Sequence, residues 1–251
     1  MKVSVITACY NSAATVLDTI RSVAGQTHAD IEHVFVDGGS QDATLDILRA
    51  NGGPKARLIT GPDAGIYDAL NKGLQASSGE VVSFLHADDI YAADDVVSTV
   101  VRAMAGDSLD ALYGDVEFVR PENLAKVVRL YSSRRFRPSR IAWGWMPAHP
   151  ALFVSASVFR RFGGFKTDYK IAGDFEFIAR VFSKPQLRYR YLPKVLVRMR
   201  TGGLSTRGLR STLIINQESL RACRENGIST NYLKILSKYP AKALEFLLVS
   251  K

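Results

Sequence analysis

Two adjacent aspartates, Asp88 and Asp89, are the residues whose type and spacing point most directly to chemistry. They follow residues 81–85 (VVSFL), a run of mostly β-branched or aromatic residues typical of a strand covered on both faces. A parallel strand would bring both carboxylates to the carboxyl edge of a sheet, where ligands bind in open α/β sheets. Because neighbouring carboxylates repel one another, a divalent cation that also holds phosphate oxygens is their natural partner. The alternative is a solvated loop whose aspartates cap the next helix.

The segments around this pair alternate between strand-like and helix-like patterns. Strands are expected at residues 3–7, 33–36, 56–60 and 81–85, and each is followed by apolar residues at helical spacing. This alternation predicts an α/β fold with a parallel sheet and right-handed crossovers. An aromatic face, a base-edge acceptor and a metal clamp then follow the first, second and fourth strands, at Tyr10–Asn11, Asp37 and Asp88–Asp89. These are the parts needed to hold a nucleotide diphosphate.

Two well-known nucleotide motifs are absent from the sequence. No GxGxxG follows the first strand, which argues against a dinucleotide-binding Rossmann enzyme. Neither GxxxxGKS nor GxxxxGKT occurs, which excludes a P-loop nucleotide triphosphatase. The strand ends themselves are therefore expected to form the nucleotide site.

The charge balance of the 251-residue chain points to an anionic partner. Lys and Arg number 33 against 24 Asp and Glu, which gives a formal net charge of +9. Nucleotide, lipid phosphate, nucleic acid and a membrane surface all carry the complementary charge, but no recognition helix or RNP-like motif supports nucleic-acid binding. Cys9 and Cys223 lie far apart and in no CxxC spacing, so neither a disulfide framework nor a structural zinc site is indicated.

The predicted location follows from the start of the chain and from its hydropathy. Lys2 leads directly into the strand-like VSVIT with no signal-peptide pattern, and no stretch approaches the roughly 18 apolar residues that span a bilayer. Together with the two unpaired cysteines, this pattern predicts a protein of the reducing cytoplasm.

Seven segments, in order and spread over residues 1 to about 205, match the pattern of one enzyme family. They are VSVITACYNSA, VFVDGGSQD, GPDAGIYDALNKG, SGEVVSFLHADD, MPAHPALFVSASVFRRFGGF, YKIAGDFEFIARVF and VRMRTGGLS. In these segments the chain resembles the family 2 glycosyltransferases of the GT-A fold. The GIYDALNKG and HPALF pieces are most similar to the branch that builds bacterial colanic acid, O-antigen and other surface polysaccharides.

The resemblance implies an inverting transfer of a sugar from a UDP- or GDP-type nucleotide sugar to a hydroxyl of a polyprenyl-diphosphate-linked glycan. It also implies a nucleotide-sugar-binding half at residues 1–115, an acceptor-binding and catalytic half at residues 116–210, and a helical tail at residues 211–251. The alternative function is a non-catalytic protein that binds a nucleotide sugar or an anionic glycan. Hydrolysis of the donor to free nucleotide diphosphate would separate the two.

On the donor side, the resemblance assigns several contacts to the first two strand ends. Thr7, Tyr10 and Asn11 fall where the family places the loop under the nucleobase. Asp37 matches the carboxylate that accepts from the base N3–H, whereas Gly38 replaces the second aspartate that usually follows it. Because the first aspartate is the one that binds, this departure leaves the expected contact in place.

The HADD segment matches the metal-binding motif of the family, with His86 where Asp or Asn is more usual. Asp88 and Asp89 are expected to supply oxygen ligands for the donor ribose and for Mn²⁺ or Mg²⁺. His86 is expected either to face the metal with a neutral imidazole nitrogen or merely to end the strand.

Asp174 in AGDFEF corresponds to the catalytic base of the family. An inverting transfer needs one carboxylate to take the proton of the acceptor hydroxyl. Glu176 is the rival, but a helix turns by about 200° over two residues, so both cannot face one site. The alternative for Asp174 is a cap of the helix that it begins.

Further residues are expected to complete the site. His149 precedes a strand and either closes the site or is structural. Arg198 and Arg200 precede the glycine pair that includes Gly203, an arrangement that predicts a flexible loop closing over the diphosphate; the alternatives are an edge strand and a simple turn. Four residues share faces of one helix, and one of them is expected to contact the donor unless they only form surface pairs: Tyr67, Asp68, Asn71 and Lys72.

A membrane surface is one expected partner of the acceptor side. The basic run at residues 132–140 leads into Trp143 and Trp145, which suits a headgroup boundary or the diphosphate of a lipid-linked acceptor. An amphipathic tail begins near Tyr232 and ends in an apolar stretch at residues 243–249. The alternatives are a solvated loop and a tail that packs on its own domain or on a second subunit.

Overall fold

The computed structural model describes residues 1–202 and 208–239. The helices and strands follow one another in the order β1 (Val3–Cys9), α1 (Val16–Ala24), β2 (Ile31–Asp37), α2 (Thr44–Asn51), β3 (Ala56–Thr60), α3 (Ile66–Ala76), β4 (Val81–Phe84), β5 (Asp89–Tyr91), α4 (Val96–Gly106), β6 (Ala111–Arg120), β7 (Asn123–Tyr131), the 3₁₀ turns η1 (Pro138–Trp143) and η2 (His149–Ala151), β8 (Leu152–Ser155), α5 (Ala156–Phe162), α6 (Gly173–Phe182), β9 (Tyr189–Arg200), α7 (Gly208–Glu225) and α8 (Tyr232–Leu236).

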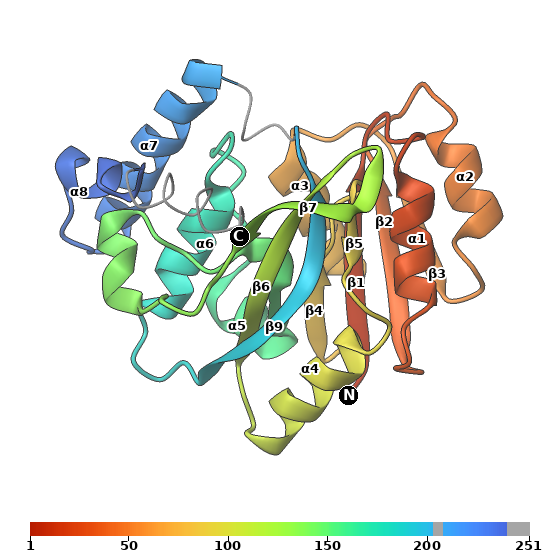
Figure 1. Cartoon of the computed structure of the whole chain (residues 1–251), viewed down its shortest axis with the longest axis horizontal. Helices are drawn as coiled ribbons and strands as arrows, with labels where there is room; N and C mark the ends of the chain where they lie inside the picture. Colours follow the sequence, from red (N-terminus) through yellow and green to blue (C-terminus); the bar gives the residue numbers. More distant parts are fainter. Residues whose placement is uncertain (203–207, 240–251) are drawn as a thin grey trace.

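Nine strands of the described chain form one sheet, in the order β3-β2-β1-β4-β8-β6-β9-β5, with β7 paired to β6 (Figure 1). The first four strands in this order run parallel, whereas β8 pairs antiparallel with both β4 and β6. Helices cover both faces of the sheet. The mixed α/β fold with a mostly parallel sheet confirms the fold class predicted from the sequence.

Side chains of the central strands alternate between two hydrophobic layers. In β1, Val3 and Val5 pack into one layer together with α4, whereas Ile6 packs into the other layer with α3 and α6. In β4, Val82 joins the layer of Ile6. This period of two is the one expected for strands with both faces covered.

The register of the parallel strands places the predicted donor-side groups at one edge. Cys9 at the end of β1 is paired with Asp37 at the end of β2, and β4 runs parallel on the other side of β1. After β4 the chain turns at Ala87–Asp88 into β5, and β5 lies against α1 through a bond from Thr19 Oγ1 to the Asp89 carbonyl (2.7 Å). The carboxyl edge therefore carries the groups that the sequence placed there.

Helix α3 is attached to the segment that leads into α6. The Asn71 side chain both accepts from the Phe165 N–H and donates to the Phe165 carbonyl, each at 2.8 Å. The Tyr67 hydroxyl donates to the Ile171 carbonyl (2.5 Å). A Cβ at Gly173 would lie 2.7 Å from the Tyr67 ring, so only glycine permits this approach. The start of α6 is thereby fixed relative to the donor half.

Helix α7 holds the same segment from the other side. The Glu218 carboxylate accepts from the backbone N–H groups of Lys170, Ile171 and Ala172, at 2.7, 2.9 and 2.8 Å. Because these residues immediately precede α6, the position of the first turn of α6 depends on helices from both halves of the sequence.

The described residues also answer part of the membrane expectation. Neither residues 1–202 nor 208–239 contain a helix with the length and hydrophobicity that a membrane crossing requires. The predicted amphipathic tail begins as α8, and its apolar part at residues 243–249 lies outside the described residues.

We expect Asn71→Ala to lower the free energy of unfolding by about 2 kcal/mol, because two backbone groups of Phe165 lose their partner. Denaturant unfolding would measure this. Asn51→Ala is the matched control: Asn51 is exposed and makes one bond within its own helix, to the Ile47 carbonyl. Equal effects of the two substitutions would show that Asn71 does not tie the two halves together.

Candidate active site

A chain of hydrogen-bonded side chains joins the end of β4 to the start of α6. His149 Nδ1 lies 3.0 Å from Asp174 Oδ2, and His149 Nε2 lies 3.0 Å from His86 Nε2. His86 comes from the segment after β4, His149 from η2 and Asp174 from the first turn of α6. Three residues that the sequence singled out separately are therefore in contact.

The hydrogen bonds determine which ring nitrogens carry protons when both imidazoles are neutral. We assign the Nδ1 proton of His149 to its bond with Asp174, which leaves His149 Nε2 as an acceptor. His86 must then donate from Nε2. Burial and the neighbouring His149 lower the pKa of His86 to about 4, against the opposing effect of Asp88 and Asp174, so that His86 is neutral at pH 7.

The Asp174 carboxylate is ionised at neutral pH. Burial acts to raise its pKa, but the electrostatic attraction and hydrogen bond of His149 and the N–H of Phe175 outweigh burial, and the pKa lies below its ordinary value. Its Oδ1 accepts from the Phe175 N–H at 2.8 Å, and 15% of the side chain is exposed. Asp174 therefore keeps a negative charge and some access to a ligand.

Glu176 occupies a different environment from Asp174. Its side chain is fully buried and accepts from Arg180 at 3.0 Å on each carboxylate oxygen. Lys166 and Asn226 approach the same carboxylate, at 3.4 and 3.3 Å. Glu176 therefore holds the interior together and is not available as a base.

The two aspartates of the HADD segment do not face the same way. Asp88 lies in the turn before β5 and is partly exposed, whereas Asp89 begins β5 and is fully buried. Burial and the charge of Asp88 raise the pKa of Asp89 well above its ordinary value, and Arg200 opposes this shift. The two carboxylates thus lie in different environments, and direct binding of one ion by both stays a prediction.

The donor set at this turn fits a cation that is shared with phosphate oxygens. In the two described ranges, no group of three or more His, Cys, Asp or Glu side chains is arranged to hold a metal. Mg²⁺ is commonly held by one or two carboxylates together with substrate phosphates. Both Asp89 oxygens lack a hydrogen-bond partner in the described structure, and a nearby cation would favour their ionised form. Asp88 therefore fits as a direct ligand, with Asp89 behind it.

The two arginines predicted to lie on a flexible loop are strand residues, which corrects that expectation. Arg200, the last residue of β9, donates from Nη1 to the Asp88 carbonyl (2.7 Å) and pairs through Nη2 with Asp18. Arg198 pairs with Glu117 at 3.0 Å. Arg200 thus fixes the backbone of the HADD turn, and Gly203 lies outside the described residues.

Thr7 lies inside β1, which extends beyond it to Cys9, and not in the loop where the sequence placed it. The Thr7 side chain is fully buried and its hydroxyl is 2.9 Å from His33 Nε2. The His33 ring also packs on Phe35, with 3.9 Å between ring centroids. Burial lowers the pKa of His33 to about 3, so this histidine is a neutral interior residue.

Tyr10, Asn11 and Asp37 do gather at the sheet edge. The Tyr10 side chain is 63% exposed, and Asn11 Oδ1 accepts from the Gln41 N–H (2.8 Å), which joins the two strand ends. Asp37 is buried and accepts from the N–H groups of Gly39 and Ser40 at 3.0 and 2.9 Å. Tyr10 is thus open to a ligand, whereas Asp37 orders the loop beside it.

The departure at position 38 has a steric reason. A Cβ on Gly38 would lie 2.3 Å from the carboxylate of Asp63, which comes from the loop before α3. The second aspartate of the usual pattern would therefore require the Asp63 side chain to move.

The polar residues that the sequence paired on α3 mostly bond to other parts of the protein. Asp68 accepts from Lys72 (2.8 Å) and from the Ala64 N–H (3.0 Å), and Lys72 also donates to the Pro62 carbonyl (2.9 Å). Both polar groups of Asn71 bond to Phe165, and the predicted donor contact of this helix stays a prediction. Tyr67 and Asp68 line a pocket of about 370 Å³ together with residues 167–170.

Comparison with known families decides the class of this site. The model of glycosyl transferase family 2 matches residues 4–163. The chain belongs to glycosyl transferase family 2. It is a glycosyltransferase, and this membership excludes the alternative of a non-catalytic binding protein. A PGL/p-HBAD biosynthesis glycosyltransferase of Mycobacterium tuberculosis (strain H37Ra) is 32% identical over 207 residues, which cover 80% of this chain and 78% of that one.

Solved structures of other glycosyltransferases share the fold. TarS of S. aureus, solved in complex with UDP-GlcNAc, matches with a TM-score of 0.69 and 20% identity, covering 87% of this chain and 66% of that chain. The mannosyltransferase PcManGT of Pyrobaculum calidifontis, in complex with GDP-Man and Mn²⁺, matches with a TM-score of 0.61 and 22% identity, covering 88% and 64%. The glycosyltransferase therefore has the GT-A fold.

The contact between His86 and His149 is the feature of the glycosyltransferase site that sequence reasoning missed. The two residues are 63 positions apart, and no local pattern relates them. A usable signal was present, because each histidine stands beside a segment matched to the family, HADD or HPALF. Arg200 and the HADD turn form a second such pair, 112 positions apart.

We expect acidification from pH 7 to pH 5 to destabilise the glycosyltransferase partly through His33. Since its folded pKa of about 3 lies below the ordinary value of 6.5, the unfolded chain binds the proton first, and stability falls as the pH drops through 6.5. The contribution is about 2 kcal/mol at pH 5. Urea unfolding of the wild type and of His33→Gln at both pH values would measure it. The same pH dependence in both proteins would refute the assignment.

Proposed function

We propose that this glycosyltransferase moves a sugar, with inversion, from a UDP- or GDP-type donor to a hydroxyl of a polyprenyl-diphosphate-linked glycan in surface-polysaccharide biosynthesis. The observation that carries the proposal is the ionised, partly exposed carboxylate of Asp174, held by His149 next to the HADD turn. Relatives support the donor class, since TarS was solved with UDP-GlcNAc and PcManGT with GDP-Man and Mn²⁺.

In the proposed reaction Asp174 acts as the general base. The acceptor oxygen attacks the anomeric carbon while the bond from that carbon to the diphosphate oxygen breaks, and the acceptor proton moves to the Asp174 carboxylate. The His149 N–H remains bonded to Oδ2 and orients the carboxylate. A carboxylate with a low pKa is a weak base, so its contribution depends on its position close to the attacking oxygen.

The donor would lie along the carboxyl edge of β1, β2 and β4. The exposed Tyr10 ring offers a face for the nucleobase. Asp37 Oδ2 accepts only from the Ser40 hydroxyl and keeps acceptor capacity, but the Asp37 side chain is fully buried, so a direct bond from the base would require the Gly39–Ser40 loop to move aside. Asp88 is proposed to hold a divalent cation together with the diphosphate, and such a cation would neutralise charge on the leaving group.

A contact with the lipid surface is part of the proposal. Trp143 at the end of η1 and Tyr232, Leu233 and Leu236 on α8 are exposed by 44, 49, 82 and 43%. Lys234 lies over the Trp143 ring at 5.6 Å, so that apolar and cationic groups occur together. Such a combination suits a headgroup boundary.

We expect Asp174→Asn to lower turnover by about 10²- to 10⁴-fold, because an amide cannot take the acceptor proton. Release of nucleotide diphosphate from a panel of UDP- and GDP-sugars with Mn²⁺ would measure it, and donor affinity should stay within about twofold, since Asp174 is bonded to the HADD segment only indirectly, through His149 and His86. Glu176→Gln is the control: it should weaken stability more than turnover, because Glu176 is bonded to Arg180 in the interior. Full turnover of Asp174→Asn would remove this residue from the mechanism.

We expect Asp88→Asn, which removes a direct ligand, to weaken metal-dependent binding of the nucleotide diphosphate more than Asp89→Asn, because loss of a residue behind a ligand costs about 10- to 100-fold. The reason is that Asp88 is partly exposed and Asp89 is buried with a raised pKa. Calorimetric titration with and without Mn²⁺ would measure both affinities. The reverse order of effects would make Asp89 the ligand and contradict the assignment.

A further inference from the structure

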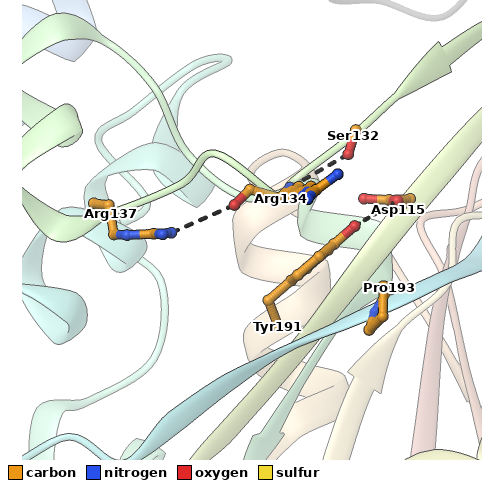
Figure 2. Close-up of a pocket in the computed structure, with 6 residues that line it drawn as sticks. All are labelled: Asp115, Ser132, Arg134, Arg137, Tyr191 and Pro193. Atoms are coloured by element: carbon orange, nitrogen blue, oxygen red, sulfur yellow. Dashed lines mark hydrogen bonds between the residues drawn. The ribbon is translucent and has the colours of Figure 1, made fainter.

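A second pocket lies away from the donor edge, between β6, β9 and the loop after β7. It has a volume of about 780 Å³ and is lined by Asp115, Ser132, Arg134, Arg137, Tyr191 and Pro193 (Figure 2). This volume is in the range of small-molecule sites. Hereafter these six residues are called the arginine pocket.

The two arginines of this pocket resemble other exposed arginines of the described chain, such as Arg102, and differ from three arginines that are less exposed. Arg180, Arg198 and Arg200 each pair with a carboxylate. Arg134 and Arg137 have no carboxylate within ion-pair distance among residues 1–202 and 208–239, and both are exposed. Arg137 Nη1 donates to the carbonyls of Phe136 (2.7 Å) and Arg134 (3.4 Å), which leaves the N–H groups of Nη2 and Nε for a ligand.

The carboxylate of the pocket is engaged in holding its wall. Asp115 is only 8% exposed, and it accepts from the Tyr191 hydroxyl (2.8 Å) and from the Ser133 N–H (2.7 Å). The pocket contains two guanidinium groups and one carboxylate that is shielded from solvent, so its net charge is positive. Figure 2 shows Arg134 beside Ser132 and Asp115, with Tyr191 reaching toward them from β9.

The pocket is connected to the catalytic chain through one short backbone segment. Ser133 Oγ accepts from the Ala148 N–H (3.1 Å), and Ala148 immediately precedes His149. The Tyr131 hydroxyl donates to the Met146 carbonyl (2.7 Å). The loop that carries Arg134 is therefore fixed against the segment that places His149 beside Asp174.

From this arrangement we infer that the arginine pocket binds the phosphate or diphosphate group of the acceptor. The inference rests on the proposed function, because it concerns the acceptor of the same transfer. Guanidinium groups suit phosphate oxygens, since their N–H donors match the oxygens in pairs. The donor diphosphate is proposed to lie at the ends of β1, β2 and β4, and none of these strands contributes a residue to the arginine pocket, so the two phosphate groups would have separate sites.

The inference is tested by binding measurements on the full chain without divalent cations. Inorganic pyrophosphate and farnesyl diphosphate are the charged probes, and farnesol is the uncharged one. We expect the double variant R134Q/R137Q to raise the Kd of farnesyl diphosphate at least about tenfold, because charge-assisted hydrogen bonds are lost. The control R102Q/R160Q removes two charges from exposed arginines outside the pocket and should change the Kd less than about twofold.

The outcomes separate the sources of the anion. Loss of pyrophosphate binding in R134Q/R137Q would show that the pocket recognises the diphosphate itself, and loss of farnesyl diphosphate binding alone would show that the prenyl-linked form is required. Both results support the inference. Equal loss in the control variant, farnesol binding as tight as farnesyl diphosphate, or an effect only on phosphatidylglycerol vesicles would overturn it.

Failure of this inference is distinguishable from failure of the proposed function. R134Q/R137Q should hydrolyse the nucleotide-sugar donor at the wild-type rate, since neither arginine belongs to the donor edge. Unchanged diphosphate affinity with intact donor hydrolysis would reject the pocket assignment alone. A wild-type protein that releases nucleotide diphosphate from no sugar donor would reject the proposed function, whatever the pocket binds.

Discussion

The bond between His149 and Asp174 is the interaction on which the site depends. It joins the first turn of α6 to η2, and the second nitrogen of His149 extends the contact to the end of β4. Three segments far apart in sequence are held at one point by two hydrogen bonds between partly buried groups. Because unsatisfied polar groups at such a place are costly, the bonds also restrict how these segments can move.

Order around this point comes from buried ionic and backbone contacts. Arg200 fixes the HADD turn through the Asp88 carbonyl, and Glu218 fixes the residues before α6 through three backbone N–H groups. Asn71 adds the connection from α3. A site assembled from several elements in this way places its carboxylate by the fold and not by a single loop.

The fold and the location of the site follow from local patterns, whereas several side-chain roles do not. Strand runs and the polar groups after them are set by residues close in sequence, so the carboxyl edge was predictable. Thr7 was misplaced because β1 extends two residues further than its apolar run indicates. The arginines of β9 were misplaced because their partners, Asp18 and Glu117, are distant in sequence. Helical geometry alone indicated that Asp174 and Glu176 cannot both face one site. The role of Glu176 was not predictable, because it depends on the packing of Arg180 in the interior.

The hydrogen bonds between Glu218 and residues 170–172 determine at which positions segments of this protein can be exchanged for those of a related glycosyltransferase. Helix α7 follows α6 in sequence, yet its Glu218 carboxylate accepts hydrogen bonds from the backbone N–H groups immediately before α6. In a chimera that takes α7 from a relative but keeps residues 165–173, those N–H groups would face the α7 helix of the other protein. Productive crossover points therefore lie before Phe165 or beyond α7, and α7 is inherited together with Asp174, the proposed base.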